Sequence, residues 1–258
     1  MSQEFYANPR WDVDTWVEVI GVEYERLIDA YSFDDDFRAL GGAIRLLDVG
    51  CGTAIFPSYL DPMLSPDIHV GVDLLDQSRA SLDRATEVMG QLDHFTVGDT
   101  FLGRIEDLPP LDDRSYHAVW AIHSFTTVDV ARMPAAIDRL MNTLQPAGYL
   151  YVYQLTAASA YQRVHDAYRA SRGGIPYMEF EDTVKILGAA GHDYEVCELA
   201  FDHIVPDTQE ALGEYLRKVT LDDSTPVELF DPLLAEFRAQ GVVRFPQTVN
   251  LIAVRRQG

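Results

Sequence analysis

A glycine-rich turn and two acidic residues stand where a nucleotide-like ligand would need them. The segment Leu46–Ala54, LLDVGCGTA, is a short apolar run that ends in two glycines one residue apart. Glycines at this spacing let the backbone turn sharply and let a ligand approach it closely. Asp73 follows the next apolar run and Asp99 the one after it. A carboxylate at Asp73 can accept hydrogen bonds from both hydroxyls of a ribose, and one at Asp99 can accept from an adenine amino group.

The elements that would position these residues alternate between strands and helices. Short apolar runs predict strands, at 44–49, 68–72, 94–97, 118–122, 148–153, 194–199 and 243–254. Helical periodicity predicts the segments between them, at about 77–90, from 129–134 to 144, within 156–175 and at about 180–190. Repeated βα units predict an α/β fold: a doubly wound, mostly parallel seven-stranded sheet with helices on both faces. In such a sheet, ligands bind beyond the carboxyl ends of the strands.

The last strand is expected to run antiparallel, because it follows a strand and two helices and not a simple crossover. Pro246 marks an edge of this strand or a bulge. We expect one domain over residues 1–258. Residues 1–40 form an N-terminal helical lid, residues 44–155 bind the cofactor, and the two helices predicted in 207–240 form part of a cap over the substrate.

The amino-acid composition limits the classes of molecule that the protein is expected to bind. Lys and Arg number 20 against 41 Asp and Glu, a formal net charge of −21, which argues against nucleic acid or an anionic membrane as partner. The two cysteines, Cys51 and Cys197, lie far apart without metal-ligand spacing, so we expect neither a metal site nor a disulfide scaffold. The acidic N-terminal segment and the lack of an 18-residue apolar run predict a cytoplasmic protein. The lack of basic patches and the expected cap favour a small-molecule substrate. The oligomeric state stays open.

Four motifs along residues 44–155 resemble the successive motifs of class I S-adenosylmethionine-dependent methyltransferases: LLDVGCGTA, VGVDLLDQS at 70–78, VGD at 97–99 and LQPAGYL at 144–150. The resemblance implies a cofactor site in which Asp48 orients the amino group and Gly50 and Gly52 pass under the methionine part. It assigns Asp73 to the ribose and Asp99 with Thr100 to the adenine. Neighbouring positions complete the implied contacts: Cys51, Thr53, Leu74 and Ile122. Ala54 stands where the family has a third glycine.

Two other functions are compatible with such a fold. A nicotinamide-dependent oxidoreductase would need glycine at position 55 for its GxGxxG turn, and Ile55 stands there, which disfavours it. A protein of the same fold that binds the cofactor without transferring methyl, as a sensor or a rearrangement enzyme, remains the main alternative.

The overall layout is similar to histamine N-methyltransferase and its relatives. The long gap between Asp99 and the fourth strand, the two-helix insert and the final segment RFPQTVNLIAVRR carry this similarity. It implies that His123, just past the fourth strand, and Gln247, in the last strand, contact the substrate. It also implies that Asp34 corresponds to an acid that binds the substrate amine.

Methyl transfer to a nitrogen or oxygen of a small molecule needs an aligned nucleophile and a base that takes its proton. Histidine is the side chain best suited to this near neutral pH, so we expect His123 to be the catalytic base; the alternative is a polar pocket wall. His165 either lines the pocket or packs beside it. Tyr6 and Trp16 either close over the substrate as an aromatic lid or pack against the core.

Overall fold

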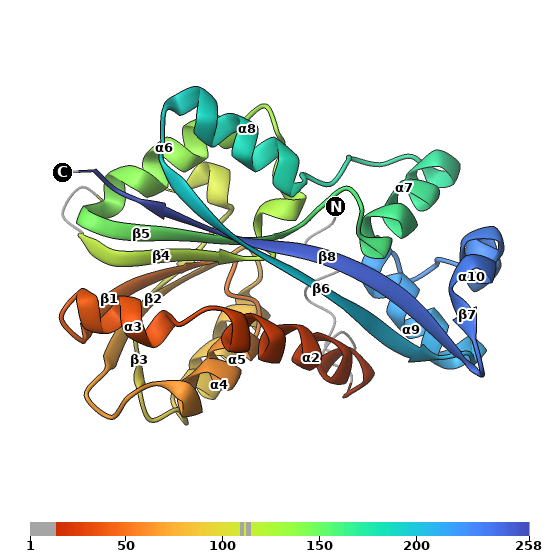
Figure 1. The fold of residues 1–258 in the computed structure, drawn as a ribbon, viewed down its shortest axis with the longest axis horizontal. Helices are drawn as coiled ribbons and strands as arrows, with labels where there is room; N and C mark the ends of the chain where they lie inside the picture. The colour runs from red at the N-terminus through yellow and green to blue at the C-terminus, as the bar shows by residue number, and fades with distance from the viewer. Residues whose placement is uncertain (1–13, 109–110, 112–114, 258) are drawn as a thin grey trace.

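The computed structural model describes residues 14–108, 111 and 115–257, and Figure 1 shows their arrangement around one twisted sheet. The sheet has the order β3-β2-β1-β4-β5-β8-β6. Its strands are β1 (Ala43–Val49), β2 (His69–Asp76), β3 (Phe95–Leu102), β4 (Tyr116–Ile122), β5 (Leu144–Leu155), β6 (Tyr194–Pro206) and β8 (Val242–Arg255). Strands β1 to β5 pair in parallel, and β8 lies antiparallel between β5 and β6. The predicted doubly wound sheet with an antiparallel last strand is confirmed. A two-residue strand that the sequence did not predict, β7 (Arg238–Ala239), also pairs with β8.

Helices cover both faces of the sheet (Figure 1). One face carries α2 (Asp14–Ala30), α3 (Phe33–Ala39), α4 (Ile55–Leu60) and α5 (Arg79–Met89). Their apolar sides pack with the strands into a core rich in aromatic rings, including Tyr24, Phe33, Phe56 and Trp120. The other face carries α6 (Met133–Thr143) and α8 (Phe180–Ala190), which pack on it through residues such as Ile137, Leu140 and Leu187. The described residues also include the short 3-10 helices η2 (Asp61–Met63), η3 (Ile105–Asp107), η4 (Phe125–Thr127) and η5 (Val227–Phe230).

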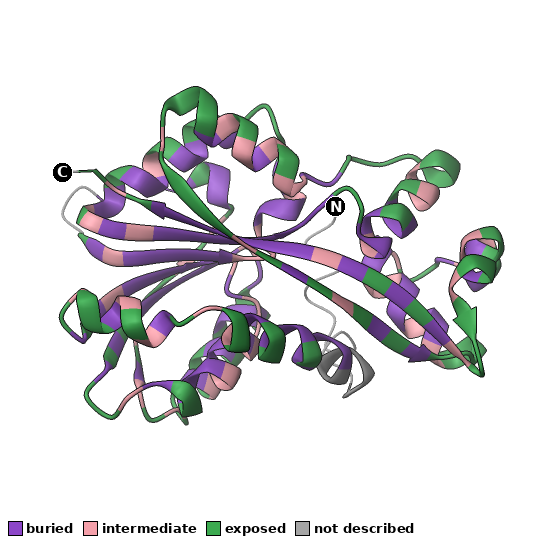
Figure 2. Cartoon of the chain, in the orientation of Figure 1, coloured by how far each residue is buried: buried purple, intermediate pink, exposed green. Residues whose placement is uncertain are grey.

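A third core lies outside the main sheet. Strands β6 and β8 stay paired as far as Pro206 and Val242, whereas the pairing of β8 with β5 ends at Val249. The helices α7 (Ala160–Arg172), α9 (Gln209–Thr220) and α10 (Asp231–Phe237) pack on this two-stranded extension (Figure 1), around residues that include Leu216, Phe230 and Phe245. Figure 2 shows the buried and exposed residues that alternate along β6. Residues 207–240 therefore contribute α9 and α10 to a layer on this extension, and their role as part of a cap over the substrate stays a prediction.

Pro246 lies in the extension of β8, where its register partner is Asp202 of β6 and no pairing with β5 remains. A proline is tolerated there because one side of the strand carries no ladder. Of the two alternatives that the sequence left open, an edge or a bulge, the structure shows the edge.

Strands β2 and β3 run further than predicted. The sequence pattern ended them at residues 72 and 97, but they continue to Asp76 and Leu102. Asp73 is held inside the sheet because its carboxylate accepts hydrogen bonds from the Tyr116 hydroxyl (2.7 Å) and from the backbone N–H of Asp99 (2.8 Å). The prediction that Asp73 and Asp99 follow the ends of their strands is therefore wrong.

Among the described residues, no helix combines the length and the apolar character needed to cross a membrane.

Candidate active site

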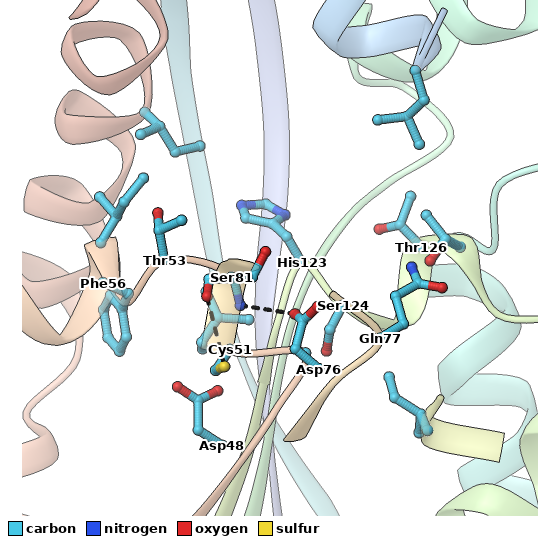
Figure 3. A pocket seen from close by; sticks show the side chains of 18 of the residues that line it. Asp48, Cys51, Thr53, Phe56, Asp76, Gln77, Ser81, His123, Ser124 and Thr126 are labelled. Carbon is cyan, nitrogen blue, oxygen red and sulfur yellow. Dashed lines mark hydrogen bonds between the residues drawn. The ribbon is translucent and has the colours of Figure 1, made fainter. Parts of the chain in front are cut away.

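A cavity of about 740 Å³ opens at the carboxyl ends of β1, β2 and β4, beside the segment that follows β3. Its volume is in the range of about 300–1,000 Å³ that is typical of small-molecule sites. The strand order reverses between β1 and β4, because β2 and β3 lie on one side of β1 and β4 and β5 on the other. Open α/β sheets bind ligands at such a point. Figure 3 shows Asp48, Cys51, Asp76 and His123 around this site.

The glycine turn after β1 forms the floor of the cavity. Gly50 and Gly52 have φ angles of 73° and 52°, and Ala54, which precedes α4, has a φ of 62°. The N–H of Gly50 donates to the carbonyl of Leu75 (2.7 Å), which ties the turn to the end of β2. A Cβ on Gly50 would lie 2.4 Å from the Cβ of Ser124, whereas one on Gly52 would meet nothing within 4 Å. Gly50 is therefore needed for close packing, and Gly52 leaves open space for a ligand.

Two buried carboxylates flank this turn. Asp48, the sixth residue of β1, is 4% exposed, and burial raises its pKa to about 7, with a further contribution from the charge of Asp76. Asp76, the last residue of β2, accepts hydrogen bonds from the N–H of Gly52 (3.0 Å) and of Ser78 (2.8 Å). Burial also raises the pKa of Asp76, against the effect of these hydrogen bonds.

All the predicted cofactor residues at the glycine turn line the cavity, whereas part of the remaining predicted cofactor set does not. The cavity is lined by Asp48, Gly50, Cys51, Gly52, Thr53, Ile122 and His123. Four predicted contacts are not among its lining residues: Asp73, Leu74, Asp99 and Thr100. Asp73 points instead toward Tyr116 and Arg45, the latter 3.4 Å away, and Asp99 and Thr100 are exposed.

Asp76 occupies the position that the sequence analysis gave to Asp73. The signal was the residue two places later: Ser78 caps α5 by accepting from the N–H of Ser81, so the helix begins at Arg79. Asp76 is thus the acid nearest the strand-to-helix junction. After β3, the cavity is lined by Arg104, Ile105 and Glu106, which is 3% exposed and pairs with Arg104.

A histidine–carboxylate cluster forms another part of the cavity. His123 has a φ of 57°, a conformation that non-glycine residues rarely adopt, and its N–H donates to the carbonyl of Tyr153 (2.9 Å). Its Nε2 makes a short hydrogen bond to Glu23 of α2, whose other oxygen lies 3.2 Å from Nε2 of His203 on β6. Glu23 is 1% exposed; burial alone would raise its pKa, but the two histidines outweigh this and hold the pKa at about 2.

Sequence reasoning missed Glu23 and His203. The signal for Glu23 was its spacing: Val19, Glu23 and Leu27 follow one another at four-residue intervals on the buried face of α2. A carboxylate on an apolar helix face needs a partner, and its partners are His123, just after β4, and His203 in β6.

The predicted substrate residues are scattered. Gln247 and His165 are buried close to the cavity but are not among its lining residues; the ring of His165 stacks on Tyr177, which does line it. Asp34 is elsewhere, where it accepts from the N–H and hydroxyl of Ser65 and pairs with Arg38. Tyr6 lies outside the described residues, and the side chain of Trp16 is not described.

Polar atoms in the cavity wall fit a ligand with several hydrogen-bonding groups. The hydroxyls of Ser124 and Thr126 are buried and have no hydrogen-bond partner among the described residues. Buried polar groups of this kind are costly unless a ligand or water satisfies them. Within the described residues, no group of three or more His, Cys, Asp or Glu side chains has the arrangement of a metal site.

Comparison with known proteins agrees with this geometry. Residues 47–152 match the family described as a methyltransferase domain. No curated protein matches the chain.

Solved structures share the fold over nearly the whole chain. A Thermotoga maritima protein described as an S-adenosylmethionine-dependent methyltransferase, possible histamine N-methyltransferase, is 14% identical (TM-score 0.56, 99% of each chain covered). The N-methyltransferase NodS of Bradyrhizobium japonicum, in complex with S-adenosylhomocysteine, is 15% identical (TM-score 0.53, 99% of this chain and 96% of that one). An S-adenosylmethionine-dependent methyltransferase of Leishmania major is also 15% identical (TM-score 0.53, 98% and 80%). At these identities the likeness shows a common fold.

Proposed function

We propose that this chain, which carries a methyltransferase domain over residues 47–152, transfers the methyl group of S-adenosylmethionine to a nitrogen or oxygen of a small molecule. The observation that carries the proposal is the shared cavity: a glycine turn with two buried carboxylates lies in the same space as a histidine bound to a buried carboxylate. One part suits the cofactor that the domain match indicates, and the other suits an acceptor that must lose a proton.

The cofactor part has a group for each end of S-adenosylmethionine. Asp48, at the end of β1, would take the amino group of the methionine part, and the turn at Gly50–Thr53 would pass beneath that part. Asp76 would accept from the ribose hydroxyls, since each of its oxygens already accepts one backbone hydrogen bond and keeps further lone pairs. Arg104, Ile105 and Glu106 would flank the adenine.

Flat and apolar side chains line the acceptor part. Tyr161 and Tyr177, whose rings stack with centroids 6.2 Å apart, line the cavity together with Ile175 and Leu221. Such a concave wall of flat and apolar side chains suits a small acceptor better than a polymer.

The bound cofactor supplies a methyl group already activated by its sulfonium. The protein then has to align the acceptor, keep water out and remove one proton. His123 is the group we assign to that proton, because it lines the cavity where β4 ends, beside Ser124 and the glycine turn.

The first test is whether the purified protein forms S-adenosylhomocysteine from S-adenosylmethionine in the presence of a panel of small amines and phenols. We expect turnover with at least one acceptor, and no binding of NADH. Tight binding of S-adenosylmethionine without product for any acceptor would favour the same fold used for binding alone. Binding of NADH only would overturn the cofactor assignment.

Two matched variants test the cofactor geometry. Asp76→Asn should weaken S-adenosylhomocysteine binding by about 10-fold or more, because hydrogen bonds to a charged acceptor are each worth about 1.5–3 kcal/mol. Asp99→Asn, the same change at an exposed site outside the cavity, should leave affinity within about twofold. Isothermal titration calorimetry measures both, and the reverse ranking would mean that the ribose lies against β3.

A further inference from the structure

We propose that Glu23 and His203 are positioning residues that fix His123 in one tautomer, with its Nε2 protonated and its Nδ1 free to take the proton of the acceptor. This inference rests on the proposed function for the identity of the reaction, and on the hydrogen bonds of the cluster for the atom. It assigns roles to two residues on α2 and β6 that the sequence motifs do not reach.

The carboxylate of Glu23 determines where the protons are. Its two oxygens face two imidazole nitrogens, Nε2 of His123 and Nε2 of His203. An ionised carboxylate only accepts hydrogen bonds, so both nitrogens must carry protons. The low pKa of Glu23 is consistent with the ionised form. A neutral His123 that is protonated on Nε2 has its lone pair on Nδ1.

The far side of the cluster is consistent with the same assignment. Because Nε2 of His203 donates to Glu23, its Nδ1 must accept, and the hydroxyl of Tyr215 lies 3.0 Å from it. The Tyr215 oxygen in turn accepts from Nε2 of Gln247 (3.3 Å). Gln247 also accepts from the N–H of Tyr161 (3.3 Å). The chain from Gln247 to His123 thus has a donor and an acceptor at each step.

Burial keeps this arrangement in place. Glu23, His203, Tyr215 and Gln247 are each at most 2% exposed, whereas the side chain of His123 keeps 22% of its surface exposed and lines the cavity. Among the described residues, the ring of His123 makes its hydrogen bond through Nε2, and its Nδ1 has no partner there. The supports of the cluster are therefore buried, and its partly exposed side chain in the cavity wall, that of His123, is the one with an unpaired ring nitrogen among the described residues.

The other titratable groups around His123 are neutral tyrosines. The rings of Tyr24 on α2 and Tyr153 on β5 lie 6.4 and 4.8 Å from the His123 ring, centroid to centroid, and burial raises the pKa of both. The charged groups of the same cavity come from other elements: Asp48, Asp76, Arg84, Arg104, Glu106 and Lys218. Glu23 is the carboxylate in direct contact with the His123 ring.

The proton step balances with these groups alone. As the acceptor atom bonds to the methyl carbon, the carbon–sulfur bond breaks and its electron pair stays on sulfur, which gives S-adenosylhomocysteine. The proton of the acceptor atom passes to Nδ1 of His123. The negative charge of Glu23 stabilises the imidazolium that forms, and the proton leaves to solvent after product release.

The first test needs no activity. In protein labelled with ¹⁵N-histidine, two-bond ¹H–¹⁵N spectra distinguish protonated from unprotonated ring nitrogens, and the variants His123→Asn and His203→Asn assign the signals. We expect His123 and His203 to carry their protons on Nε2 at pH 8. A proton on Nδ1 of His123 would overturn the proposal.

The second test is the pH profile of kcat/KM. Glu23→Gln removes the charge that stabilises the imidazolium, so the acid limb should move down by about one pH unit. His203→Phe removes the hydrogen bond that shares this charge, so the limb should move up. Glu25→Gln, the same change at an exposed position of α2, should leave the profile unchanged. General structural damage would not shift the limb in opposite directions.

The experiments distinguish a failure of the positioning role of Glu23 from a failure of the proposed methyl transfer. If the wild-type protein forms no S-adenosylhomocysteine, the proposed function fails, and the tautomers measured by NMR still decide the role of Glu23. If the wild type is active and Glu23→Gln retains its acid limb and kcat, the positioning role is wrong. Should Glu23→Gln melt early, Glu23→Asp keeps the charge, and we then expect the wild-type acid limb with a lower kcat; a shifted limb in Glu23→Asp would contradict the role of the charge.

Discussion

At the scale of single residues, Asp48 links cofactor binding to pH. Its pKa is about 7 in the folded protein and near its ordinary value of 3.8 when unfolded. A carboxyl whose pKa is raised by folding favours the folded state below the unfolded value, and this contribution is lost as pH rises toward 7. We therefore expect cofactor-free Asp48→Asn to be more stable than the wild type at pH 8, by about 1–4 kcal/mol. The difference should shrink toward pH 4, as measured by urea unfolding at pH 5 and pH 8.

The same carboxyl should make cofactor affinity depend on pH. Only ionised Asp48 can pair with the ammonium of the methionine part, so wild-type affinity for S-adenosylhomocysteine should fall as pH drops below 7. Asp48→Asn should bind more weakly and with little pH dependence. Equal free energies of unfolding for Asp48→Asn and the wild type at pH 8 would contradict a pKa of Asp48 that is raised by folding.

At the scale of elements, the turn after β1 packs closely against the segment that follows β4. Gly50→Ala should lower the free energy of unfolding by more than about 2 kcal/mol, because a left-handed alanine costs about 1–2 kcal/mol and its Cβ would meet that of Ser124. Adding Ser124→Gly removes the colliding atom and should recover part of the loss. Additive effects of the two changes in urea unfolding would mean that the strands move apart to make room.

Element ends were the part of the fold that sequence pattern placed least well. Helices and strands were predicted because apolar spacing is a local property, and the turn at Gly50 and Gly52 was predicted because glycine marks it. The ends of β2 and β3 were not, since charged residues such as Asp73 usually signal a turn. Here the Tyr116 hydroxyl, more than 40 residues away in the chain, holds Asp73 within the sheet. That contact exists only in the folded protein.

At the scale of the whole molecule, the candidate site joins parts that no local pattern connects. His123 was predicted from its place after the fourth strand, but its partners are 100 and 80 residues away, in the first helix described and in β6. They meet because β6 and β8 extend past the main sheet, where β6 and α9 pack against α2 and residues at the end of α9 line the cavity. A single sequence indicates that these helices and strands exist. It does not indicate which of their faces contact one another in the folded protein.

Net charge acts on the whole molecule as well. With a formal charge of −21, the folded chain repels itself at pH 7.5, and salt screens that repulsion. Most ion pairs among the described residues involve exposed arginines, such as Arg38 with Asp35, and contribute little that screening could remove. We therefore expect 0.5 M NaCl to raise the melting temperature by about 2–6 °C over 10 mM NaCl at pH 7.5. The gain should shrink at pH 5, close to the pI of about 4.5. A melting temperature that falls with salt at pH 7.5 would show that local ion pairs outweigh the net repulsion.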